Sequence, residues 1–148
     1  MYDPWADADH RPDLNYLLDD DLPRGDGWWL PWMRLIVIRR SLPAVVQRCV
    51  MAHELVHVDY GDVQVVHLGP DGPRLSRRQE SAADREAARR LLQLRELAAA
   101  MLAHPANPRA VAHELDVTVE VLQRRLEQLT EEEGLWLRSE LAGREHAA

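Results

Sequence analysis

The apolar positions between residues 43 and 60 predict a buried α-helix. Pro43 suits the first turn of a helix, whereas Gly61 is a typical stop signal. Ser41 is a candidate N-cap, because its hydroxyl can accept hydrogen bonds from backbone N–H groups of the first turn. The apolar residues that define the stretch are Val45, Val46, Val50, Met51, Leu55, Val56 and Val58.

Three shorter segments before this helix have the composition of β-strands. Residues 14–18 predict a short strand, and residues 33–38 predict a stronger one because they are nearly all apolar and rich in β-branched side chains. Residues 27–32 form an aromatic segment that Pro31 restricts to an edge or irregular strand. We expect a small sheet against the 43–60 helix, with an edge strand that can pair with an extended peptide.

The C-terminal half of the chain is predicted to be helical. Residues 77–103 have the pattern of one long helix, which the Pro-containing residues 104–108 end. Shorter helices are expected at 109–115 and 118–129. A last short helix should begin at Glu131, because acidic residues suit a helix N-terminus.

These elements place the chain in the α+β class. Residues 63–68 are compatible with a further strand or with a loop over a cleft, and residues 1–12 with an acidic lead-in. A length of 148 residues suits one domain. We expect residues 1–105 to form the core and residues 106–148 to form a helical segment packed on it, in a single compact domain.

Composition and charge narrow the classes of function. The net charge of −7 argues against binding nucleic acid by electrostatic attraction alone. No apolar run is long enough to span a membrane, and the acidic N-terminus lacks a basic-then-apolar signal segment. The single cysteine, Cys49, excludes an internal disulfide and fits a reducing compartment. We therefore expect a cytoplasmic protein with no membrane partner.

The predicted 43–60 helix contains an H-E-x-x-H motif formed by His53, Glu54 and His57. Residues four apart lie on one helix face, so both imidazoles can reach one Zn²⁺ ion, and Glu54 is close enough to act as the catalytic base on a water molecule. The alternative is a helix with two histidines that bind no metal. That alternative is less favourable, because burying two histidines and a carboxylate without a partner is costly.

A catalytic zinc ion needs a third protein ligand and one open position for water. The helix predicted at 77–103 offers Glu80 as that ligand. Asp84, on the same face one turn later, can accept a hydrogen bond from the ring N–H of a ligand histidine and so fix its tautomer. Alternatively, Glu80 and Asp84 are surface partners of the many arginines on this helix.

Two further features have competing explanations. Tyr60, His67 and Arg77 are candidate donors to the oxyanion of a peptidase, but packing, a strand surface and solvated charge explain them better. Residues 111–129 resemble a helix-turn-helix, which suggests a DNA-associated regulatory module. The surrounding acidic charge favours a structural role for these helices over DNA binding.

Several of these segments together resemble the ImmA/IrrE family of metallo-endopeptidases. The resemblance extends over about residues 13–130 of the sequence. It is specific at the metal motif and looser elsewhere, with Val56 at a position where the family often has Gly. The segments that carry it are residues 50–57 (VMAHELVH), residues 80–84 (ESAAD), residues 35–38 and residues 110–118.

The resemblance implies a small zincin-like metallopeptidase domain, with a short sheet packed on the H-E-x-x-H helix and a helix-turn-helix-like C-terminal segment. It also implies a cytosolic zinc metallo-endopeptidase that hydrolyses peptide bonds in a helix-turn-helix repressor, often of a phage or mobile element. In that scheme His53, His57 and Glu80 hold Zn²⁺ and Glu54 is catalytic. The alternative is an antirepressor that binds its protein partner without cleaving it.

Overall fold

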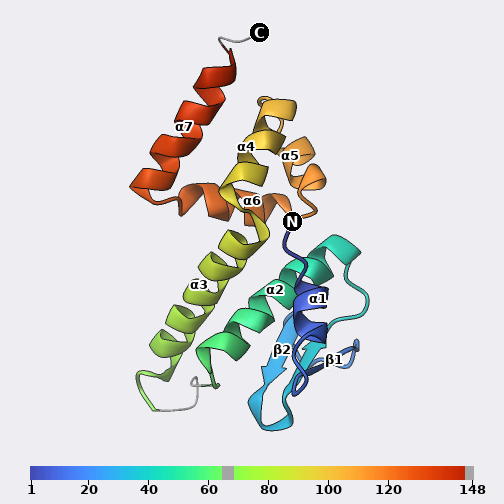
Figure 1. Cartoon of the computed structure of the whole chain (residues 1–148). Coiled ribbons are helices and arrows are strands. Elements are labelled where there is room, and N and C mark those ends of the chain that lie inside the picture. The colour runs from blue at the N-terminus through green and yellow to red at the C-terminus, as the bar shows by residue number, and fades with distance from the viewer. Residues whose placement is uncertain (65–68, 146–148) are drawn as a thin grey trace. The chain divides into compact units, whose positions relative to one another are not determined.

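A computed structural model describes residues 1–64 and 69–145 of the chain (Figure 1). The described residues form a three-stranded sheet and seven α-helices, so the predicted α+β class is confirmed. They divide into two compact units, one of residues 3–87 and one of residues 1–2 with 88–148. The packing of residues 106–148 on the 1–105 core stays a prediction.

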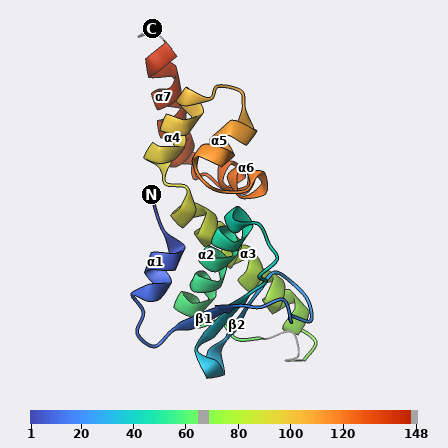
Figure 2. The ribbon, with the colours of Figure 1, turned by 90° about the vertical axis from the view of Figure 1, so that its right-hand side faces the viewer.

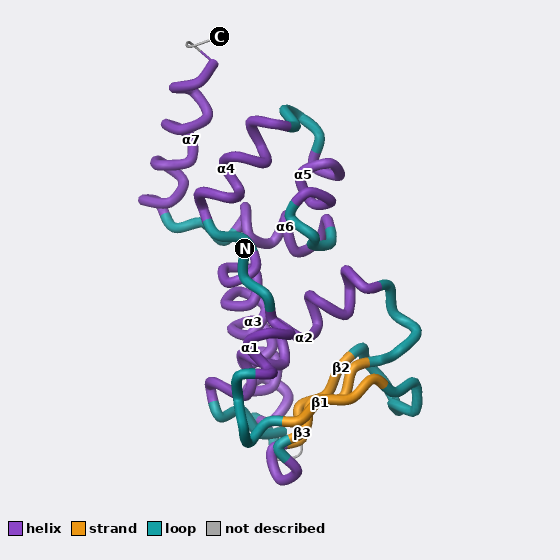
Figure 3. The backbone as a smooth tube through the Cα atoms, turned by 45° about the vertical axis from the view of Figure 1, so that its right-hand side comes forward, coloured by secondary structure: helices purple, strands orange, loops and turns teal. Residues whose placement is uncertain are grey.

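The sheet belongs to the 3–87 unit and contains all three predicted strands (Figure 3). The strand order is β1-β3-β2. β3 (Leu35–Ile38) is central, with β1 (Asn15–Leu18) parallel to it and β2 (Gly27–Leu30) antiparallel. In the β2 ladder Gly27 pairs with Ile38. β2 is an edge strand, as predicted, and it ends where a short 3₁₀ helix begins at Pro31.

α2 (Ala44–Tyr60) confirms the predicted metal-motif helix and packs on β2 and β3 (Figure 2). The core between helix and sheet contains Ile36, Ile38, Met51 and Leu55, none of which exposes measurable surface. Burying each such side chain contributes about 1.5–3 kcal/mol. This packing fixes which face of α2 remains available for polar chemistry.

The predicted N-cap of α2 is wrong. The helix is preceded by Pro43, which offers no side-chain hydrogen bond to the first turn. Ser41, in the loop that joins the sheet to the helix, instead donates its backbone N–H to Oδ1 of Asp20, which follows β1, at 2.8 Å. Ser41 lies too far from the helix start, because the chain between is extended at Pro43.

The N-terminal lead-in contains a helix that the sequence did not predict, α1 (Pro4–Asp9). Asp3 caps it by accepting hydrogen bonds from the backbone N–H groups of Trp5 and Ala6. Pro4 occupies the first helical position, where its missing N–H costs nothing. α1 packs on α2 in the same unit.

The single long helix predicted at 77–103 is wrong in two respects. α3 (Gly72–Leu91) begins earlier than predicted. Pro73 lies in its first turn, where proline is favoured, and not in a loop before the helix. The helix also breaks after Leu91, and α4 (Leu94–Ala103) follows. At the break the Leu92 carbonyl accepts a hydrogen bond from Nε of the buried Arg125 instead of from the next helical turn.

The later helices lie close to their predicted places. α5 (Pro108–Glu114) is capped by Asn107 and α6 (Val119–Glu127) by Thr118. α7 (Glu131–Glu145) begins at the predicted acidic run but is longer than the short helix expected. Among the described residues, no helix combines the length and apolarity needed to cross a membrane.

Candidate metal centre

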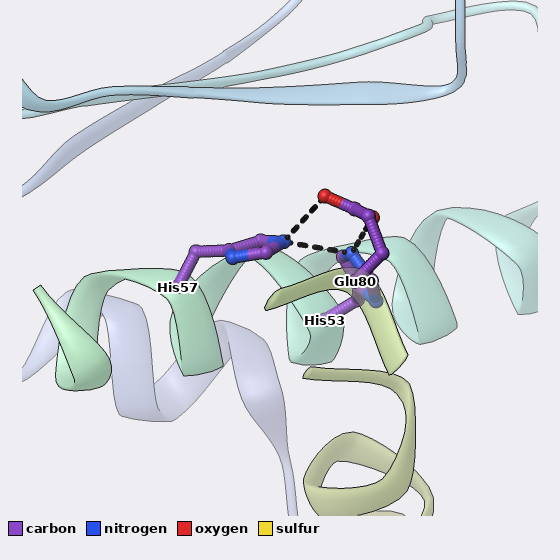
Figure 4. Close-up of side chains that lie close together, drawn as sticks. All are labelled: His53, His57 and Glu80. Atoms are coloured by element: carbon purple, nitrogen blue, oxygen red, sulfur yellow. Dashed lines mark hydrogen bonds and ion pairs between the residues drawn. The ribbon is translucent and has the colours of Figure 1, made fainter. Parts of the chain in front are cut away.

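Two helices bring His53, His57 and Glu80 together at one point (Figure 4). The two Nε2 atoms of His53 and His57, one turn apart on α2, are separated by 3.0 Å. Glu80 reaches them from α3, with Oε2 3.1 Å from Nε2 of His53 and Oε1 3.3 Å from Nε2 of His57. One potential ligand atom from each residue lies within 4.8 Å of the others.

The opposite edge of each imidazole faces a second carboxylate. Nδ1 of His53 lies 2.9 Å from Oδ1 of Asp84, the residue that the sequence predicted for this position. Nδ1 of His57 lies 2.8 Å from Oδ2 of Asp62, which the sequence analysis did not identify. An ionised carboxylate only accepts hydrogen bonds, so each Nδ1 donates its proton to a carboxylate and each Nε2 is left as the ring atom that can face Glu80 or a metal.

This arrangement fits a metal cation. The three groups that face one another are two imidazole lone pairs and a carboxylate, which repel unless a proton or a cation lies among them. Two imidazoles and one glutamate are also a ligand set of catalytic zinc sites. The donor chemistry therefore supports a metal at the His53–His57–Glu80 cluster, which we call the triad.

The electrostatics of the triad favour positive charge. Burial lowers the pKa of His53, but hydrogen bonds with Asp84 and Glu80 outweigh burial and raise it to about 10. The pKa of His57 is also raised, since Glu80 and Asp62 more than offset its burial. The two histidines in turn lower the pKa of Glu80. The carboxylates thus stabilise a cation at this point.

Glu54 is oriented differently from its histidine neighbours and is buried, with 6% of its surface exposed. Burial raises the pKa of its carboxyl, while His53, His57 and hydrogen bonding by the Trp29 backbone partly offset that effect. A carboxylate with a raised pKa is a stronger base than a solvated one, which suits proton transfer near neutral pH.

A cleft of about 480 Å³ adjoins the triad. It is lined by β2, by Glu54 and His57 of α2, and by Glu80 of α3. Arg24, in the loop before β2, contributes a cation that sequence reasoning missed.

Two of the three predicted oxyanion donors, Tyr60 and Arg77, are not among the described residues that line the cleft. Tyr60 is half exposed at the end of α2, and Arg77 lies on α3 outside the lining. His67 lies outside the described residues, as does most of the segment predicted at 63–68; Val63 and Gln64 form a loop.

Comparison with models of protein families identifies the family of this chain. Residues 14–127 match the family model of the IrrE N-terminal-like domain, Peptidase_M78. The match includes the sheet, both helices that carry the triad, and the helices up to α6. Neither the curated proteins nor the solved structures include a match to the chain.

Proposed function

Because the chain belongs to the IrrE N-terminal-like domain family of peptidases, we propose that it is a zinc-dependent metallo-endopeptidase whose substrate is a helix-turn-helix transcriptional repressor of a phage or mobile element. The observation that carries the proposal is the triad, together with Glu54 in the lining of the cleft that adjoins it. A peptidase family implies a protein substrate, and a repressor substrate would place the activity in the cytoplasm.

His53, His57 and Glu80 would hold the zinc ion, and Asp84 and Asp62 would orient the two imidazoles. When bound, zinc supplies a Lewis acid that polarises the scissile carbonyl and acidifies a water molecule. The preference for zinc rests on the donor set, since imidazole with a single carboxylate suits Zn²⁺ better than it suits the oxygen-loving Mg²⁺ or Ca²⁺.

Glu54 would be the catalytic base. Its carboxylate accepts a proton from the water that attacks the scissile carbonyl, and it returns that proton to the leaving amine as the C–N bond breaks. Its position in the lining of the cleft allows contact with both water and substrate. Its burial keeps the carboxylate from being solvated by bulk water and supports its role as a base.

The edge of the sheet supports an endopeptidase that accepts an internal stretch of chain. Among the described strands β2 pairs only with β3, so no described strand lies along its other edge, and its residues Gly27 to Trp29 line the cleft. An extended peptide can add to such an edge by backbone hydrogen bonds. That binding mode places a peptide bond beside Glu54 without requiring a free chain end.

Cleavage of a purified helix-turn-helix repressor tests this function. Zinc-loaded wild type should convert the repressor into two fragments that mass spectrometry assigns to one internal cut, and Glu54→Gln should bind zinc but produce no fragments. Repressor that is bound but left intact by the wild type would contradict the protease and favour a non-cleaving antirepressor. Equal cleavage by Glu54→Gln would contradict the assigned base.

A further inference from the structure

The C-terminal end of α2 folds back over the last turn of the helix. Gly61 adopts the left-handed conformation with φ of 64° and ends the helix. The backbone N–H of Gly61 donates to the Val58 carbonyl at 3.2 Å, and that of Asp62 donates to the His57 carbonyl at 3.0 Å. This capping turn is readily adopted by glycine. It brings the Asp62 side chain next to the helix residue that it contacts.

Asp62 is therefore fixed to His57 twice. Its backbone N–H binds the His57 carbonyl, and its Oδ2 lies 2.8 Å from Nδ1 of the His57 ring. Only 9% of the His57 side chain and 15% of the Asp62 side chain are exposed, so water competes weakly for this hydrogen bond. Rotation of the ring would break the bond and turn Nε2 away from His53 and Glu80.

We propose that Asp62 is a positioning residue that holds the ring of His57 with its proton on Nδ1, and thereby strengthens metal binding at the triad. The inference rests on the proposed function in one respect, namely that the triad binds zinc. Asp62, in the cap of α2, would orient His57 as the predicted Asp84 on α3 would orient His53. Each ligand histidine then has its own carboxylate, and losing Asp62 should weaken the His57 ligand alone.

The two carboxylates differ in how they are supported. Asp84 reaches His53 from another helix, and 31% of its side chain is exposed. Asp62 is only five residues from His57, and its position depends on the Gly61 turn within the same segment. The orientation of His57 is thus set within α2 and its cap, whereas that of His53 depends on α3.

The zinc dissociation constants of Asp62→Ala and Asp62→Asn, measured by competition with a chromophoric chelator, test the inference. Asp62→Ala should weaken zinc binding about 10–100-fold, the usual effect of removing a carboxylate that orients a ligand histidine. Asp62→Asn should weaken it less, because the amide oxygen can accept the same hydrogen bond from Nδ1. Asp71→Asn is the matched control, since the Asp71 side chain is 74% exposed and forms an ion pair with Arg74.

The outcomes separate this inference from the proposed function. If wild type binds zinc and Asp62→Ala binds it as tightly as Asp71→Asn does, the Asp62 inference is overturned while the metallopeptidase stands. Equal losses in Asp62→Ala and Asp62→Asn would overturn the hydrogen-bond assignment in favour of a charge effect. Absence of zinc binding in the wild type would overturn both. Far-ultraviolet circular dichroism of the metal-free variants checks that each is folded. If Asp62→Ala is unfolded, the zinc affinity of Asp62→Asn relative to Asp71→Asn supplies the test.

Discussion

A Cβ atom added to Gly27 would lie 2.9 Å from Oε1 of Glu54. The first residue of β2 thus approaches the buried carboxylate of α2 so closely that no side chain fits between them. The same Cβ would lie 2.5 Å from Cγ1 of Val50, one turn earlier on α2. A glycine within a strand often marks such a close approach. The position of the strand and the position of the proposed catalytic base are therefore coupled.

Gly27→Ala should displace the Glu54 carboxylate and lower kcat on the order of 100-fold, since a misplacement of about 1 Å has that effect on catalytic groups. Zinc affinity should fall by much less than the about 10–100-fold expected for loss of an orienting carboxylate, because the atoms nearest to the added Cβ belong to Val50 and Glu54, which are not metal ligands. Steady-state kinetics on a fluorogenic peptide and zinc competition measure the two quantities.

The double variant Gly27→Ala with Val50→Ala separates packing from catalysis. Removing Cγ1 of Val50 relieves the closer clash and should recover much of the lost stability, while the contact with Glu54 and the low kcat remain. Full recovery of kcat in the double variant would show that Gly27 affects only the packing of β2 on α2.

Arg125 and Glu133 should stabilise the helical unit of residues 88–148. The Arg125 guanidinium is buried and donates to both oxygens of Glu133, at 3.0 and 2.8 Å. At the start of α7 the backbone N–H of Thr130 also donates to Oε2 of Glu133, and the backbone N–H of Glu133 donates to Oγ1 of Thr130. Glu133→Gln should lower the free energy of unfolding by about 1–3 kcal/mol at pH 7. Urea titration measures this loss, and the exposed Glu132→Gln should change it by less than about 0.5 kcal/mol.

The contribution of Glu133 to the free energy of unfolding should decrease at acidic pH. The hydrogen bond with Arg125 lowers the pKa of Glu133 in the folded protein. A carboxylate with a lowered pKa stabilises the fold above its unfolded pKa of about 4.3, and that stability is lost as pH falls through the folded pKa. The difference between wild type and Glu133→Gln should be constant from pH 7 to about 5 and shrink below about 4. A difference that grows in acid would contradict the assigned ion pair.

The Asp3 cap should stabilise α1. Asp3→Ala removes the acceptor for the N–H groups of Trp5 and Ala6 and should cost about 1 kcal/mol of unfolding free energy. Asp13→Ala, which removes an exposed acid from the neighbouring loop, is the control for the change in net charge. Thermal denaturation of both variants at one pH measures the difference, and equal melting temperatures would argue against the cap.

Local patterns in the sequence were enough to predict much of this fold and site. The strands and α2 follow from apolar composition, and the four-residue spacing of His53 with His57 and of Glu80 with Asp84 predicts that each pair shares a helix face. In contrast, α1 was not predicted, although Asp3 and Pro4 form a helix start signal. The short length of that helix left no apolar period to support it.

The features that were missed depend on contacts distant in sequence or on backbone geometry. The break between α3 and α4 involves Arg125, which lies more than 30 positions away along the chain. Asp62 reaches His57 only because Gly61 reverses the chain direction, although a Gly-Asp pair after the motif is a signal that could have been read. The role of Gly27 is visible only once the spacing between β2 and α2 is known.

Zinc content tests the central claim most directly. By inductively coupled plasma mass spectrometry, wild type purified without added zinc should contain about one zinc ion per chain. Glu54→Gln should retain this zinc, and Glu80→Ala should lose it. No zinc in the wild type, even after reconstitution, or full retention by Glu80→Ala, would contradict a metal centre formed by His53, His57 and Glu80.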